Sequence, residues 1–225
     1  KLNKWKNDNN VKLILGTDLL YCIGFNNVKN IDADVVYGNS QRMGLPMGYG
    51  GPHTGFFSTK MEYIRYLPGK LVSKCKTFTG ENAYRMALQN REQHIKKDKA
   101  TSNICTSQVL LSILNASYIM FNGYKELQME ALKLYYLNYY LTSRLYQIGL
   151  QPLTTNIKHY FDTNWFYVNT DNIIDINTFM SEIKNYGYHI NHEIVECEDK
   201  QLLLLGINTS GFSNIDDVDK FIHNL

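Results

Sequence analysis

Short apolar runs separated by turn signals mark the N-terminal part of the chain. Residues 11–15 form a mostly apolar run that enters a turn at residues 16–18, which predicts a buried strand. Residues 34–37 and 53–58 predict two further strands. Parallel strands need crossovers of about a dozen residues or more. We see no helical crossovers here and nothing in front of the first strand, so we expect part of a sheet that belongs to a larger domain.

The middle of the chain has helical spacing. Residues 107–121 and 125–147 carry apolar side chains three and four positions apart, and Gly123 separates the two predicted helices. Gly149 and Pro152 predict the end of the second helix, as a C-cap followed by a residue that cannot continue it. The apolar positions are Val109, Leu110, Ile113 and Leu114 in the first stretch, and Leu127, Leu132, Leu134, Leu137 and Leu141 in the second.

After residue 150 the pattern changes to short elements, which predict a small α+β domain. We therefore expect a partial large domain over residues 1–149 and a small C-terminal domain over residues 150–225. The predicted elements of the small domain are a strand at 160–169, a helix at 177–186, a strand at 202–207 and a helix from its N-cap, Ser213, to His223.

Composition changes this picture little. The chain has 225 residues, 44% of them apolar, which suffices for one sizeable core or for a main domain with a smaller one attached. A net charge of +2 calls for no polyanionic partner, and no nucleic-acid surface is expected. No apolar run approaches the roughly 20 residues that cross a bilayer, so no membrane span is expected. The cysteines form no CxxC pair, and His189 and His192 lack a third ligand at a suitable spacing, so no metal site is predicted.

The densest local signal is the stretch of residues 41–53, which holds four glycines and two prolines between two predicted strands. Glycine at this density lets backbone amides approach a ligand or another backbone closely. A tight loop with no ligand is an equally good interpretation. A nucleotide-binding loop is rejected, because Phe56 and Phe57 stand where a Walker A motif needs Lys and Ser or Thr.

A second signal is the charged stretch of residues 90–106. Such charge runs usually form a solvated helix face. Here three short polar side chains, Thr101, Ser102 and Asn103, directly precede a strongly apolar helix. Amides at the N-terminus of that helix can bind an anion. Our hypothesis is therefore that this stretch forms the edge of an active site.

Several blocks resemble signature sequences of the P-protein of the glycine cleavage system. They follow one order over essentially the whole chain, which is far more specific than a single short motif. The blocks are Asp-Val-Val at 34–36, Gln-Arg-Met-Gly-Leu-Pro at 41–46, Gly-Tyr-Gly-Gly-Pro-His at 48–53, Arg-Glu-Gln-His-Ile at 91–95, Thr-Ser-Asn-Ile-Cys-Thr at 101–106, Tyr-Phe-Asp-Thr at 160–163 and Gly-Ile at 206–207.

The resemblance implies an α/β fold of the fold type I PLP-dependent transferases, which are similar to aspartate aminotransferase. The chain would contain the C-terminal part of the large αβα domain and the small α+β C-terminal domain. Enzymes of this family decarboxylate glycine with pyridoxal phosphate (PLP) and pass the aminomethyl group to the lipoylated H-protein. They have two homologous halves, and only one of them binds the cofactor covalently.

The resemblance also indicates which half is present. In the cofactor-binding half a His-Lys-Thr-Phe run supplies the lysine, and Gln41 stands in that place here. A glutamine amide cannot form the covalent bond to the cofactor. The aspartate that pairs with the pyridinium nitrogen aligns with Leu15, and Asp18 lies nearby. We therefore expect the lysine-free half, with PLP bound covalently by the partner half and not by this chain.

The expected role is to shape the interface with the cofactor-bearing half; glycine and the lipoylated H-protein are the other expected partners. The isolated chain should be inactive and should self-associate. Its location would be the mitochondrial matrix in a eukaryote or the cytoplasm in a bacterium. Two alternatives stay open: a noncatalytic scaffold or regulatory paralogue and, ranked last, an unrelated aminotransferase, which would need lysine at position 41. The interface candidates are Tyr49, His53, Arg91, His94, Thr101, Ser102 and Asn103.

Overall fold

The chain forms two compact units, Lys1–Tyr124 and Lys125–Leu225. The predicted division into domains of residues 1–149 and 150–225 stays a prediction. Within the described ranges, no helix is long and apolar enough to cross a membrane. The computed structural model describes residues 1–25, 30–88, 92–102, 105–153, 160–169, 176–188, 190–197, 200–210 and 213–224.

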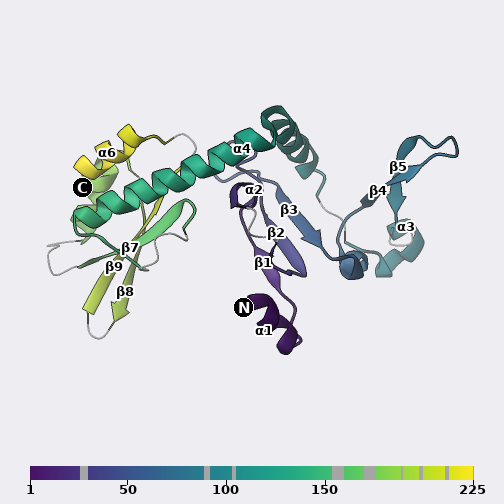
Figure 1. Ribbon diagram of the computed structural model, residues 1–225, viewed down its shortest axis with the longest axis horizontal. Coiled ribbons are helices and arrows are strands. Elements are labelled where there is room, and N and C mark those ends of the chain that lie inside the picture. Colours follow the sequence, from purple (N-terminus) through teal and green to yellow (C-terminus); the bar gives the residue numbers. More distant parts are fainter. Residues whose placement is uncertain are drawn as a thin grey trace. The chain divides into compact units, whose positions relative to one another are not determined.

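The first unit contains a three-stranded sheet in the order β1-β2-β3 (Figure 1). β1 (Ile14–Gly16) is parallel to β2 (Val35–Asn39), and β3 (Gly55–Thr59) is antiparallel to β2. The three predicted strands are confirmed, with bounds shifted by a few residues, but the expected burial of the first is wrong, because Ile14 and Gly16 are exposed. The expectation that no helix joins the first two strands is wrong, because α2 (Leu19–Phe25) lies between them in the chain. A helix this short shows no clear apolar period in sequence.

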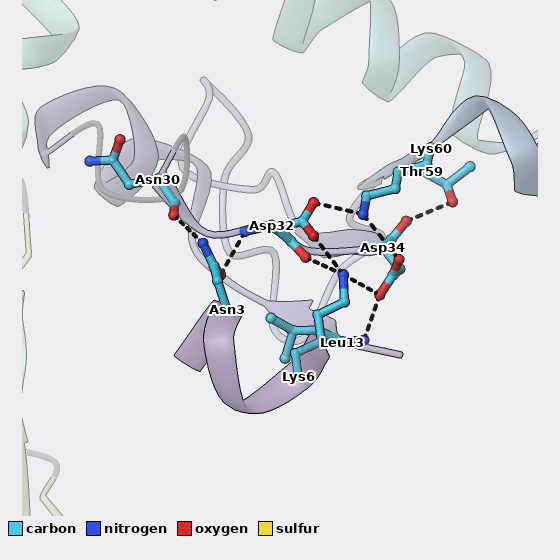
Figure 2. A network of polar contacts seen from close by, with 8 residues as sticks. All are labelled: Asn3, Lys6, Leu13, Asn30, Asp32, Asp34, Thr59 and Lys60. Carbon is cyan, nitrogen blue, oxygen red and sulfur yellow. Dashed lines mark hydrogen bonds and ion pairs between the residues drawn. The ribbon is translucent and has the colours of Figure 1, made fainter. Parts of the chain in front are cut away.

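An ion network ties the first helix, α1 (Leu2–Asp8), to the start of β2 (Figure 2). The buried ammonium of Lys6 lies 2.9 Å from an oxygen of Asp34 and 3.0 Å from one of Asp32. Lys60 contacts the same two carboxylates, at 3.2 Å from Asp34 and 2.6 Å from Asp32. Each buried charge therefore has opposite charges beside it, as burial of an ion requires.

A separate hairpin follows the first sheet. β4 (Leu71–Lys76) and β5 (Asn82–Ala87) pair in antiparallel register and form a two-stranded sheet of their own. The hydrophobic pattern does not predict this hairpin, because half of its residues are polar. Three short helical segments flank it in the chain: η2 (Met61–Tyr66), α3 (Gln93–Lys96) and η4 (Lys97–Lys99).

The long helix α4 (Gln108–Gln147) is interrupted at Gly123, where φ is 71° and ψ is 171°. Glycine tolerates this left-handed φ because it has no Cβ. The prediction of two helices separated at this glycine is confirmed. Gly149, with φ of 100°, follows the end of the second helix, as the predicted C-cap requires.

The second unit is a four-stranded antiparallel sheet in the order β6-β7-β9-β8, with the C-terminal part of α4 and the last helix packed on one face (Figure 1). The last helix begins after Asn214, whose side chain forms a capping box with Asp217, so the predicted N-cap at Ser213 is wrong by one residue. The core side chains are Leu137, Leu141, Leu145, Phe166, Ile207, Val218 and Phe221. The elements are β6 (Gln151–Pro152), β7 (Thr163–Asn169), α5 (Ile176–Asn185), β8 (Asn191–Cys197), β9 (Lys200–Asn208) and α6 (Ile215–His223).

Candidate functional site

The loop after β2 is held in place by one buried side chain of α4. The Nδ2 of Asn115 donates hydrogen bonds to the carbonyl oxygens of Ser40 (3.1 Å) and Met43 (2.6 Å). Its Oδ1 accepts a hydrogen bond from the Ser40 hydroxyl at 2.7 Å. The backbone amide of Ser40 also donates to the Thr54 carbonyl at 2.9 Å. All four residues are buried, and these hydrogen bonds therefore fix the start of the glycine-rich loop.

Gln41 lies at the first turn of this loop. Its backbone amide donates to the Asn39 side chain at 2.7 Å, and its side-chain amide donates to the Leu45 carbonyl. The Leu45 amide donates back to the Gln41 carbonyl at 3.0 Å, which closes a tight turn. The amide of Gln41 is thus engaged with its own loop and is not a nucleophile. Position 41 therefore offers no amine that could form a covalent bond with an aldehyde cofactor.

Asp18 follows β1, near the place where the family resemblance expects an aspartate. Its carboxylate lies 3.0 Å from the Nε of Arg42 and accepts a hydrogen bond from the Tyr21 amide at 3.0 Å. The negative charge of Asp18 is therefore balanced by a cation of the same chain. Both side chains are about one-third exposed.

The remainder of the glycine-rich loop is organised by one carbonyl. The oxygen of Met47 accepts hydrogen bonds from the amides of Gly50 (3.1 Å) and Gly51 (3.0 Å) and lies 3.2 Å from the Nε2 of His53. Tyr49 is fully exposed at the tip, with a positive φ of 52°. The structure therefore brings the two predicted candidates, Tyr49 and His53, together in one loop.

Three of the other candidates, His94, Thr101 and Ser102, lie in described segments that follow the hairpin β4–β5 in the chain. His94, in α3, is exposed and lines an open pocket of about 420 Å³ together with Lys70, Glu92 and Gln93. Ser102 lies next to this pocket in the structure, because its carbonyl accepts a hydrogen bond from Gly69 at 2.7 Å. The half-buried Thr101 precedes it. Two further candidates, Arg91 and Asn103, lie outside the described residues.

The N-terminal part of α4 presents large apolar side chains to solvent. Met120 and Phe121 are 76% and 91% exposed, and the apolar side chains two and three turns earlier are about half exposed. An uncovered apolar stripe of this length is unusual on a soluble monomer and marks an interaction surface. We call the set the α4 face; it consists of Val109, Leu110, Ile113, Leu114, Met120 and Phe121.

Sequence reasoning missed Asn115 and Ser40 as the residues that fix the loop. The one available signal is the position of Asn115, a polar residue within the predicted helix of residues 107–121. An unpaired amide is costly to bury, so such a residue has hydrogen-bond partners somewhere in the fold. Which partners these are depends on a contact across 75 residues of chain. Among the described residues, no group of three His, Cys, Asp or Glu side chains is placed to hold a metal ion.

The architecture belongs to the α/β, fold type I class of PLP-dependent enzymes. A glutamate decarboxylase from Lactobacillus brevis superposes on 99% of this chain with a TM-score of 0.64 at 13% identity. An alanine–glyoxylate aminotransferase from Nostoc superposes on 99% of it with a TM-score of 0.57 at 12% identity. At these identities the likeness establishes the fold alone. The predicted fold class is confirmed.

The chain belongs to the family of the glycine cleavage system P-protein, whose family model matches residues 1–218. A crystal structure of glycine decarboxylase (P-protein) in inhibitor-bound form has a TM-score of 0.81 and 28% identity, over 99% of this chain and 49% of that chain. The glycine dehydrogenase (decarboxylating) of Christiangramia forsetii is 44% identical over 154 residues, which are 68% of this chain and 16% of that protein. The Escherichia coli relative is 47% identical over 131 residues, 58% of this chain and 13% of that protein.

The family resemblance read from the signature blocks is thus confirmed. The chain spans about a sixth of the length of the curated relatives that it matches, and about half of the solved P-protein chain. The relatives and the fold imply PLP as the cofactor of the family. The loop after β2 carries the amide of Gln41, which donates to the Leu45 carbonyl, and a glutamine amide does not form an imine with an aldehyde.

Proposed function

We propose that this chain is part of a glycine dehydrogenase (aminomethyl-transferring) and comes from the half that lacks the cofactor lysine. The complete enzyme decarboxylates glycine with PLP and passes the aminomethyl group to the lipoylated H-protein. In this proposal the other half binds the cofactor covalently, and this chain shapes the interface between the halves. The observation that carries the proposal is Gln41, whose side-chain amide is bonded to the Leu45 carbonyl.

Reductive trapping tests this assignment. The complete enzyme, saturated with PLP, is treated with borohydride and digested, and its peptides are identified by mass spectrometry. We expect the pyridoxyl label on a peptide of the other half and none on peptides of this chain. The variant Gln41→Lys supplies an amine at the same place and serves as a positive control for detection. A label on this chain in the unchanged enzyme would refute the proposal.

The α4 face supports an interface role. The six apolar side chains of the α4 face are exposed in this chain, while about five-sixths of the relative's length lies outside the matched region and can supply polypeptide that covers them. A permanent interface between protein halves is apolar at its centre. The sister half is therefore the partner that we assign to this face.

Association of the halves tests the role of the α4 face. We expect Ile113→Glu, which introduces a charge at a side chain that is 56% exposed here, to weaken association of the two halves co-expressed as separate chains. Ile194→Glu is the matched control, because Ile194 is 49% exposed in β8 of the second unit. Sedimentation velocity measures the complex. Equal behaviour of both variants would contradict the assignment.

The candidates Tyr49, His53, Arg91, His94, Thr101, Ser102 and Asn103 remain proposed contributors to the active-site edge. Exchange of labelled bicarbonate into the glycine carboxyl group by the complete enzyme measures their effect. We expect His94→Ala to lower exchange while assembly is intact, and His192→Ala, an exposed histidine of the second unit, to leave it unchanged. Unchanged exchange in His94→Ala would remove this residue from the site.

A noncatalytic scaffold or regulatory paralogue remains the second candidate function, and Gln41 is compatible with it. The same exchange assay separates the two, because a scaffold paired with a cofactor-bearing half would leave exchange unaffected by every substitution in this chain that preserves assembly. We propose the mitochondrial matrix as the location if the source is a eukaryote and the cytoplasm if it is a bacterium. A relative from Schizosaccharomyces pombe whose name places it in mitochondria supports the first of these.

A further inference from the structure

The hairpin β4–β5 has two faces of different character. Side chains alternate along β4 between half-buried and exposed positions, and the half-buried set is small or apolar. The exposed set, with its cross-strand neighbour from β5, combines large apolar side chains and lysines. Val72 is 66% exposed and Tyr84 is 73% exposed. We call this set the outer face; it consists of Val72, Lys74, Lys76 and Tyr84.

Positive charge is concentrated on the hairpin and the segment that follows it. Residues 70–99 contain eight Lys or Arg and three Asp or Glu, a net charge of +5 in a chain whose total is +2. The rest of the chain is therefore acidic. Lys74 pairs across the strands with Tyr84, and Lys76 pairs with Asn82, so no carboxylate stands opposite either lysine. In the described part of the chain, neither lysine has an ion pair.

A solvated charged surface does not account for the outer face. Val72 and Tyr84 leave large apolar areas in water beside Lys74, and Phe78 at the hairpin turn is fully exposed. A two-stranded hairpin is also only marginally stable unless it packs against something else. Both features favour a surface that another molecule covers. Tyrosine is one of the residue types that most often carry binding energy in protein interfaces.

The partner is inferred from this combination of charge and apolar area. An acidic protein surface complements two unpaired lysines, and its own apolar side chains can cover Val72 and Tyr84. A nucleic acid would instead need a longer row of cations tracking phosphates. The permanent sister half is a poorer fit, because lysine is depleted at interface centres, and the uncharged α4 face suits that role.

We propose that the outer face is the docking surface for an acidic patch of the lipoylated H-protein. This inference rests on the proposed function, in which the H-protein accepts the aminomethyl group and must bind and leave in every cycle. Opposite charges raise the rate of such encounters. The neutral, apolar part of the outer face then supplies the close contact after the charges have aligned the two proteins.

Charge reversal in the complete enzyme tests the inference. The variant Lys74→Glu/Lys76→Glu is compared with Lys125→Glu/Lys184→Glu, which changes the net charge equally at two exposed lysines of the second unit. The KM for lipoylated H-protein is measured in glycine–bicarbonate exchange at low and high salt. We expect about a tenfold higher KM at low salt for the hairpin variant, with kcat unchanged and a weaker salt dependence. The control pair should stay close to the unchanged enzyme.

Further variants separate docking from folding. Lys74→Arg/Lys76→Arg keeps the charge and should restore the original KM, and equal melting temperatures show that the hairpin variants are folded. An unchanged KM in the reversed variant, an equal effect of the control pair, or loss of association between the halves would overturn the inference. So would a defect in binding an RNA oligonucleotide without a defect toward the H-protein.

Failure of the proposed function gives a different result. If the unchanged enzyme shows no exchange, the proposed activity is wrong, and calorimetric titration with H-protein then tests docking directly. If exchange proceeds and the KM for H-protein is unchanged in the Lys74→Glu/Lys76→Glu variant, the proposed activity is supported and the proposed docking surface is wrong.

Discussion

Replacing Asp34 by Asn perturbs the network that holds α1 against the sheet. The Asp34 carboxylate accepts a hydrogen bond from the Leu13 amide at 2.8 Å and pairs with Lys6 and Lys60. These contacts, the Leu13 amide first and Lys6 next, hold the pKa of Asp34 well below its usual range. Asparagine keeps the shape and one acceptor oxygen. It removes the negative charge beside Lys6, whose side chain is only 7% exposed.

The magnitude follows from this burial. Removing one partner of a buried ion pair costs about 3–5 kcal/mol. Asp32 still lies 3.0 Å from Lys6 in the variant, so the lower end of that range applies. A loss of about 3 kcal/mol raises the local opening constant roughly a hundredfold. Hydrogen exchange of the amides of residues 2–16 in the complete enzyme, followed by mass spectrometry, measures this change.

Asp32→Asn is the matched control within the same network. The Asp32 side chain is 47% exposed, so solvent screens its contacts and its loss should accelerate exchange much less. Exchange in Asp34→Asn that equals that of the unchanged enzyme, or that is slower than in Asp32→Asn, would refute the reasoning. It would mean that the buried carboxylate does not hold the helix.

The pH dependence has a definite sign. An aspartate whose folded pKa is depressed stabilises the protein fully above its unfolded pKa of about 4, and the contribution is lost as the pH falls through the lower folded value. The difference in exchange between Asp34→Asn and the unchanged enzyme should therefore stay constant from pH 7 to 5 and shrink below about pH 4. A difference that already shrinks near pH 6 would point to another group.

Two further substitutions test the glycine-rich loop. Asn115→Leu removes three hydrogen bonds and should destabilise the start of the loop by about 3 kcal/mol, seen as faster proteolytic cleavage within residues 40–53. Gly44→Ala places a Cβ 2.7 Å from the ring of Tyr118 at a φ of +83° and should lower the melting temperature clearly, at a cost of about 1–3 kcal/mol. Gly50→Ala, at a φ of +105° with no atom within 4 Å of the new Cβ, should lower it less. Equal melting temperatures for the two glycine variants, or unchanged proteolysis of Asn115→Leu, would contradict these expectations.

The spacing of apolar residues was sufficient to predict some helices and strands and not others. The apolar spacing of α4 and the glycine that interrupts it predict the two-part helix, because a helix with one apolar face repeats its apolar positions every three or four residues. The apolar pattern does not predict the strands of the hairpin β4–β5, since Lys74, Lys76 and Arg85 alternate with residues that are only half-buried. The apolar pattern does not predict β8 either, because residues 191–194 are exposed and, in the described part of the chain, β8 pairs with β9 alone.

The candidate site divides in the same way. The glycine-rich stretch and Gln41 are evident in the chain, because glycine density and the absence of an amine are properties of residue type. The clamp by Asn115 and the ion pair of Asp18 with Arg42 are not evident, because each depends on two segments meeting in space. The sequence likewise does not show what the candidate residues contact. In the structure, His53 lies beside the Met47 carbonyl, and the Ser102 carbonyl accepts a hydrogen bond from the Gly69 amide.

The sequence by itself determined the family, the lack of a lysine at position 41 and the surplus of positive charge in residues 70–99. Only the tertiary structure decided that two of those lysines share one exposed face with Val72 and Tyr84, and that the Gln41 amide is turned onto its own loop. The reason is physical: residue types set which chemistry is available. Strand register and side-chain burial set which groups face one another and which face the solvent.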